Sequence, residues 1–97
     1  MARFDIYRHD VGLIVDIQTD ILDGLTTRMM APLIPVERAP KTVGRLNPLL
    51  EIDGALYVLQ PQLMTAIAER QLGRPVGNIL RHYDQIVAAI DMVFHGF

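Results

Sequence analysis

The chain has 97 residues, 51% of them hydrophobic, and no cysteine, which predicts a single domain over residues 1–97 and excludes disulfides and zinc–thiolate sites. Its formal net charge is −2 and its nine Lys and Arg residues are scattered along the chain, which argues against direct binding of a nucleic-acid backbone. The sequence has no secretory signal and no apolar run of the roughly 20 residues that a membrane span needs, so we expect a cytoplasmic protein without membrane attachment. The high apolar fraction predicts a homodimer interface rather than only an apolar-rich core.

The first part of the chain alternates between apolar and polar residues, as antiparallel strands do. Residues 3–8 predict a half-buried strand, with Phe4 and Ile6 on its inner face. A turn over residues 9–12 leads to a second strand over 13–18, which we expect to pair with the first as a hairpin. An Asp-Gly pair then ends this unit.

Two prolines mark the next expected strand, over residues 29–36. Pro32 and Pro35 each remove a backbone donor from the ladder, so we expect an edge strand or a bulge here. Residues 39–48 form a loop. Farther along, the Asp-Gly pair at 53–54 is a strong signal for a two-residue hairpin turn between short strands.

An amphipathic helix is expected over about residues 79–94, with Asn78 as its N-cap. Gly96 follows the last turn, where glycine readily takes the left-handed conformation that ends a helix. On one face, Ala88 and Met92 are less polar than a fully solvated surface requires. The opposite face carries an apolar stripe that we expect to pack on a sheet; it comprises Ile79, Tyr83, Ile86, Val87, Ile90 and Phe94.

Three blocks of sequence, in matching order and spacing, resemble the CcdB family of toxins from bacterial toxin–antitoxin modules. The first comprises Phe-Asp-Ile-Tyr at 4–7 and Val-Asp-Ile-Gln-Thr-Asp-Ile-Leu-Asp at 15–23. The second is Arg-Met-Met-Ala-Pro-Leu at 28–33, and the third covers 86–97, closing with Phe-His-Gly-Phe. The resemblance extends over nearly the whole chain.

The resemblance implies a mainly β fold: a small SH3-like, CcdB-type antiparallel β-barrel with strands within residues 3–72 and a C-terminal α-helix, assembled as a homodimer. Residues 63–72 contain good helix formers with helical spacing. Because the family is extended there, the resemblance favours a strand. Residues 73–78 are expected to form a connector.

The resemblance also implies a function. Toxins of this family bind the A subunit of DNA gyrase and trap the enzyme on cleaved DNA, and a cognate CcdA-like antitoxin neutralises them with a disordered segment that folds on binding. The positions that correspond to the family's gyrase contacts are Ile21, Leu22, Asp91, Phe94, His95, Gly96 and Phe97. His95 stands where the best-known poison of the family has a tryptophan, so it is either a smaller stacking group or a solvated residue that suits the helix dipole.

Arg38, Lys41 and Arg45 form a loose basic cluster. This cluster is a candidate for binding acidic residues of the antitoxin, with a solvated loop as the alternative. The three histidines lack metal-ligand spacing, and we expect neither a metal nor a cofactor.

Two other functions remain open at this point. One is a binding module, an antitoxin-binding paralogue without toxicity, which the missing tryptophan favours. The other is a MazF-like endoribonuclease with the same barrel, for which the Thr-Thr-Arg run at 26–28 offers the residue types, although the acidic balance of the chain counts against it. The carboxylates of Asp16, Asp20 and Asp23 are expected to be hydrogen-bonded or solvated rather than catalytic.

Overall fold

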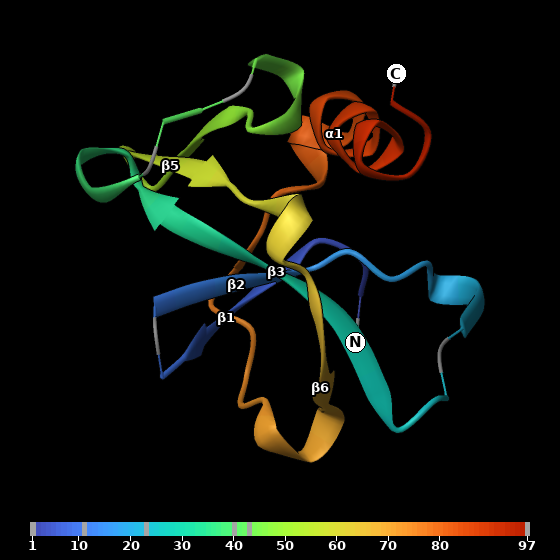
Figure 1. The fold of residues 1–97 in the computed structure, drawn as a ribbon. Helices are drawn as coiled ribbons and strands as arrows, with labels where there is room; N and C mark the ends of the chain where they lie inside the picture. The colour runs from blue at the N-terminus through green and yellow to red at the C-terminus, as the bar shows by residue number, and fades with distance from the viewer. Residues whose placement is uncertain (1, 11, 23, 40, 43, 97) are drawn as a thin grey trace.

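The computed structural model describes residues 2–10, 12–22, 24–39, 41–42 and 44–96. They form a half-barrel of antiparallel strands with a helix packed on one face, which confirms the expected fold class (Figure 1). The strands are β1 (Asp5–His9), β2 (Gly12–Asp16), β3 (Thr27–Pro35), β4 (Leu49–Ile52), β5 (Ala55–Leu59), β6 (Thr65–Ala68) and β7 (Gly77–Asn78), and the helix is α1 (Tyr83–His95). Short 3-10 turns lie between them: η1 (Asp20–Leu22), η2 (Val36–Arg38), η3 (Gly44–Leu46), η4 (Pro61–Leu63), η5 (Glu69–Gln71) and η6 (Leu80–His82). Within the described ranges, no helix has both the length and the apolar character to cross a membrane.

Two hairpins form as their turn sequences predict. β1 pairs antiparallel with β2, with Ile6 opposite Val15. β4 and β5 pair around Asp53 and Gly54, whose φ angles are 52° and 83°. Positive φ at both central residues is the geometry of a type I′ turn, which Asp-Gly favours. The strand order in the sheet is β4-β5-β3-β2-β1-β7, and β6 pairs with β3 off this path.

β3 lies inside the sheet, so the expectation of an edge strand is wrong. One side of β3 pairs with β2, and the other side pairs first with β6 and then with β5. Pro32 falls where the partner changes, and its carbonyl accepts a hydrogen bond from the Gln60 N–H at 3.0 Å. The Pro32 nitrogen lies on the same side of β3 as its carbonyl. That side is the one where the partner changes from β6 to β5, so the missing N–H removes no bond from either ladder. Pro35 is the last residue of the strand, so a central strand accommodates both prolines at positions where the ladder is already interrupted.

Both faces of the sheet carry buried side chains, whereas the sequence predicted half-buried strands. Strand alternation sends neighbours such as Ile6 and Tyr7 to opposite faces. The larger core includes side chains of α1; it comprises Phe4, Ile6, Val15, Ile17, Ala31, Leu33, Leu50, Ile52, Leu59, Ile79, Ile86 and Ala89. A separate cluster includes a side chain of β6; it comprises Tyr7, Ile14, Met30 and Ile67. The strands β1, β2 and β3 therefore contribute to both clusters.

The C-terminal segment differs from the expected helix at both ends. The Asn78 carboxamide oxygen accepts a hydrogen bond from the Leu80 N–H at 2.8 Å, at the start of η6. The residue that precedes α1 is His82, so Asn78 is not the N-cap of the helix. Among the described residues of α1, Ile86 and Ala89 are buried. Phe94 is 65% exposed and does not belong to the packed stripe, which corrects the sequence prediction. The core ends before the last helical turn, so that turn extends beyond it.

The segment over residues 63–72 is extended at its centre, as the resemblance favoured. β6 lies there between η4 and η5, and its backbone pairs with β3. Tertiary pairing thus overrides the helix propensity of the segment. The connector expected over 73–78 contains a short strand that the sequence did not predict, β7, which pairs with β1.

A buried ion pair joins β2 to β3. The Arg28 Nε donates to the Asp16 carboxylate at 2.8 Å, and the two side chains are 1% and 0% exposed. Burial raises the pKa of Asp16 above its ordinary value, while hydrogen bonds from Arg28 and from the Gln18 N–H act in the lowering direction. Protein donors therefore replace water around this carboxylate.

Replacement of Asp16 by asparagine should destabilise the fold strongly. Removing one charge from a buried ion pair typically costs about 3–5 kcal/mol, because the other charge stays buried. Asp20→Asn is the matched control: Asp20 lies 3.7 Å from Arg28, but its side chain is 62% exposed. This variant should lose less than about 1 kcal/mol. Urea unfolding measures both free energies, and equal losses would show that burial of the pair is not what stabilises it.

Candidate functional site

The C-terminal end of α1 presents an exposed aromatic side chain. Phe94 is 65% exposed, and Asp91 and His95 are exposed as well. Because residues three and four apart are neighbours on a helix surface, all three side chains lie on one side of the last turn. We call Asp91, Phe94, His95 and Gly96 the helix tip. The structure brings these four sequence-predicted residues together.

Gly96 ends the helix in the way the sequence predicts. Its φ is 80°, in the left-handed region, and its N–H donates to the Met92 carbonyl at 3.0 Å. A Cβ at this position would meet nothing within 4 Å, so the backbone conformation, rather than a clash inside the protein, disfavours other residues here. Gly96 thereby fixes the direction in which the chain leaves the helix. Phe97 lies outside the described residues.

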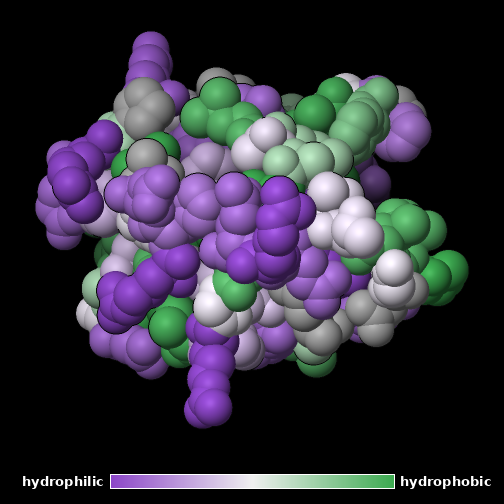
Figure 2. All heavy atoms as spheres, turned by 90° about the horizontal axis from the view of Figure 1, so that it is seen from below, coloured by the Kyte–Doolittle hydropathy of each residue, from purple (hydrophilic) through white to green (hydrophobic). Residues whose placement is uncertain are grey.

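A second apolar group lies in the connection between β2 and β3. Ile21 is 89% exposed, Leu22 46% and Leu25 50%. We call these three residues the η1 patch. Figure 2 shows hydrophobic atoms at the right edge of the molecule, where Figure 1 places the η1 connection. These side chains face solvent and are available to a partner.

Hydrogen bonds hold the η1 connection against the sheet. The Gln18 side chain accepts from the Met29 N–H at 3.1 Å and donates to the Leu22 carbonyl at 3.4 Å. The Asp20 carboxylate accepts from the Arg3 N–H at 2.9 Å. These hydrogen bonds therefore fix the backbone that carries the exposed apolar side chains of the η1 patch.

The helix tip and the η1 patch are separate surfaces within one chain. In Figure 1, the η1 connection lies to the right of the sheet and the end of α1 lies at the top, apart from it. The residues that correspond to family gyrase contacts thus divide between two places. One chain by itself does not join them into a continuous surface.

The arginine considered for RNA cleavage lies in the interior. Arg28 is 1% exposed and paired with Asp16, whereas its neighbours at 26–27 are exposed. Asp16 and Asp20 are hydrogen-bonded, as expected, and Asp23 lies outside the described residues. Within the described ranges, no group of three or more His, Asp or Glu side chains is placed to hold a metal ion.

The basic cluster of the sequence is spread over two places. Arg38 ends η2, which contacts β5, whereas Arg45 lies in η3, which contacts α1 (Figure 1). Lys41 lies between them in the chain, and all three are exposed. Arg45 thus lies next to the helix, whereas Arg38 lies next to β5.

A groove of about 610 Å³ lies between η3, the start of β4 and α1. Apolar and charged side chains share its surface; it is lined by Gly44, Arg45, Asn47, Pro48, Leu49, Asp84, Gln85 and Ala88. Sequence reasoning did not identify this groove. The sequence feature that points to the groove is the low polarity of the helix face that carries Ala88.

Comparison with known proteins agrees with the fold. A family model described as "CcdB protein" matches residues 3–96. Among solved structures, the chain is similar to one described as "Endoribonuclease in complex with its cognate antitoxin from Mycobacterial species", with a TM-score of 0.81 and 12% identity over 97% of this chain and 94% of that chain. At this identity the likeness shows the fold alone, and no curated protein matches the sequence significantly. Because the family model spans nearly the whole chain, the protein belongs to the CcdB family of toxins from toxin–antitoxin modules.

Proposed function

We propose that this toxin binds the A subunit of DNA gyrase and traps the enzyme on cleaved DNA, as the family resemblance implies. The observation that carries the proposal is the 65% exposure of Phe94 on a regular helix. An aromatic side chain held on a rigid element is a typical anchor of a protein interface, because little conformational entropy is lost when it binds. The carboxylate of Asp91, one turn earlier, adds a charge that suits a basic partner surface.

The helix tip has the chemistry to receive an arginine. The Phe94 ring offers a π face for a guanidinium, and Asp91 offers a carboxylate. His95 in its neutral form adds a second aromatic ring, smaller than the tryptophan of the best-known family member. The tip therefore offers two aromatic rings to a guanidinium, with the smaller His95 ring where the best-known family member has a tryptophan.

The endoribonuclease alternative is weaker. It is supported by a likeness of fold at 12% identity, and a shared fold does not establish a shared chemistry. Arg28, the arginine that it would use, is occupied by the buried pair with Asp16. The other alternative, a non-toxic paralogue that binds antitoxin, keeps the same groove and differs only at the gyrase-binding step.

We also propose that a disordered segment of the cognate antitoxin binds the groove between η3 and α1. Leu49 is 49% exposed there and offers apolar contact, while Arg45 offers a cation for an acidic residue. Asp84 on the opposite wall restricts where an acidic segment lies. A helix face with a neighbouring groove is a common site for a segment that folds on binding.

A homodimer completes the proposal. A single chain also leaves Leu56 and Leu63 exposed, distinct from the residues proposed for gyrase, and uncovered apolar surface favours association. Two-fold symmetry would give the assembly two helix tips.

Phe94→Ala should weaken gyrase trapping and leave the fold intact. Because Phe94 is mostly exposed, we expect a change of less than about 1 kcal/mol in the free energy of unfolding. Loss of an interface anchor should raise the concentration needed for cleavage-complex formation by at least about tenfold. A gyrase cleavage assay measures this concentration.

Leu80→Ala is the matched control, since Leu80 is 57% exposed and precedes the other end of the helix. It should trap gyrase as the parent protein does. A folded Phe94→Ala protein that traps gyrase at the parent concentration would move the site away from the helix tip. Absence of trapping by the parent protein would favour the non-toxic paralogue.

The protein should be a dimer in solution at micromolar concentration. Light scattering coupled to gel filtration should give twice the chain mass of 10.9 kDa. A mass equal to that of one chain would reject the homodimer, and with it the use of two helix tips at once.

Arg45→Glu should weaken antitoxin binding and slow association, because a favourable charge becomes a repulsive one beside the groove. Arg38→Glu is the matched control, since it makes the same change on η2, next to β5. It should leave the association rate within about twofold. Calorimetry and stopped-flow binding with the antitoxin segment measure both effects, and equal effects of the two variants would argue for long-range charge rather than for the groove.

A further inference from the structure

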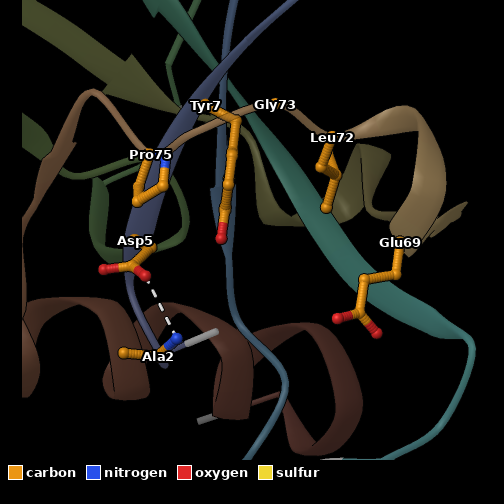
Figure 3. Close-up of a pocket in the computed structure, with 7 residues that line it drawn as sticks. All are labelled: Ala2, Asp5, Tyr7, Glu69, Leu72, Gly73 and Pro75. Atoms are coloured by element: carbon orange, nitrogen blue, oxygen red, sulfur yellow. Dashed lines mark hydrogen bonds between the residues drawn. The ribbon is translucent and has the colours of Figure 1, made fainter.

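A cavity on the β1 side of the molecule uses none of the residues proposed above for gyrase or antitoxin. Its volume is about 520 Å³, and it is lined by Ala2, Asp5, Tyr7, Glu69, Leu72, Gly73 and Pro75. Figure 3 shows the Tyr7 hydroxyl pointing into the cavity, with the carboxylates of Asp5 and Glu69 to either side of it. These groups come from β1 and η5, which are far apart in the sequence.

Tyr7 is a buried residue whose hydroxyl reaches the cavity and makes no hydrogen bond within the described part of the fold. Tyr7 is 1% exposed, and within the described residues its hydroxyl has no hydrogen-bond partner in the structure. Burial raises the pKa of Tyr7 to about 12, with further raising by Asp5, Asp16 and Glu69 and lowering by Arg28. The hydroxyl is therefore neutral at physiological pH and free to accept or donate a hydrogen bond.

The electrostatic environment of the hydroxyl is negative. Asp16 and Arg28 neutralise each other in their 2.8 Å ion pair, which leaves the charges of Asp5 and Glu69. Within the described part of the chain, neither of these carboxylates forms an ion pair. A cation in the cavity would meet two carboxylates and one hydroxyl oxygen.

Hydrogen bonds hold the Asp5 carboxylate and the backbone of Glu69 in place. Asp5 accepts hydrogen bonds from the Ala2 N–H at 3.0 Å (Figure 3) and from the Asn78 side chain at 2.8 Å. The Glu69 N–H donates to the Thr26 carbonyl at 2.8 Å, which anchors η5 beside β3. The Asp5 carboxylate is thus held ready for a ligand, and binding has to order only the Glu69 side chain.

We propose that this cavity binds a guanidinium group at the end of an aliphatic chain. Asp5 and Glu69 supply the charge, and the Tyr7 hydroxyl supplies a third acceptor, which suits the several N–H donors of a planar guanidinium. Leu72 and Pro75 supply apolar wall for the aliphatic stem. The source of this chemistry is either an arginine side chain of a partner polypeptide or a free alkylguanidine.

The test is an NMR titration of the ¹⁵N-labelled protein with three probes: agmatine, an acetylated and amidated Gly-Arg-Gly peptide, and the same peptide with citrulline. Citrulline keeps the shape of arginine and removes its charge. Saturable shifts of the amides of Glu69, Leu72 and Gly73 are expected with the charged probes, with a dissociation constant on the order of 1 mM. Tighter binding of the peptide would identify a polypeptide source, and tighter binding of agmatine a free alkylguanidine.

Three variants localise the binding. Glu69→Gln, on an exposed turn, and Asp5→Asn, which keeps one of the two acceptor oxygens that Ala2 and Asn78 use, should each weaken binding about fivefold. Tyr7→Phe removes the hydroxyl alone and should weaken it about threefold. Glu37→Gln is the matched control, since it removes an exposed carboxylate outside the cavity, and it should bind as the parent does.

Amide spectra with the dispersion of the parent protein confirm that each variant is folded. No saturable shift with either charged probe at tens of millimolar would overturn the proposal. Equal binding of the citrulline peptide would overturn it as well, and so would equal weakening by Glu69→Gln and Glu37→Gln.

Discussion

The buried pair of Asp16 and Arg28 is the interaction on which the arrangement of this sheet depends. It links β2 to β3 at 2.8 Å in the interior, where a charge without its partner would cost several kcal/mol. A shift of one residue in the register of either strand would turn one of these side chains toward the other face. The pair therefore selects one register. Arg28 also reaches the Gln18 carbonyl at 3.4 Å, so the same charge helps to hold the start of the η1 connection.

Burial on both faces of the sheet explains how so short a chain stays folded while exposing large apolar side chains. The larger core is closed by α1, and the second cluster draws on β6. The last turn of α1 lies beyond the larger core, which leaves Phe94 exposed on a helix whose earlier turns are packed. The proposed recognition at the helix tip and the stability of the core thus rest on different residues of one helix.

The fold of this chain does not by itself decide its chemistry. The chain belongs to a toxin family and shares its fold with a solved endoribonuclease. Individual side chains decide which chemistry a fold supports, since function resides in sites rather than in folds. Here the arginine that a nuclease would direct at RNA is enclosed in an ion pair, and the exposed chemistry consists of apolar and aromatic groups suited to a protein partner.

The sequence by itself determined the features that depend on neighbouring residues. The Asp53–Gly54 turn, the left-handed Gly96 and most of α1 follow from local backbone preferences, and the family blocks indicated the fold class. The tip residues of α1 could also be grouped from the sequence, because helical spacing alone places them on one side.

Only the tertiary structure decided the features that depend on segments far apart in the chain. Pro32 signals an edge by its missing donor, yet β3 is central because its pairing partner changes from β6 to β5 at that residue. Helical spacing placed Phe94 in the packed stripe. The structure leaves it exposed, because the helix sequence does not determine how far the core extends along the helix. The pairing of Asp16 with Arg28, the separation of Arg38 from Arg45 and the cavity around Tyr7 likewise arise from non-local contacts. Residue type and spacing specify local conformation, whereas the burial of each side chain is set by what the rest of the chain packs against it.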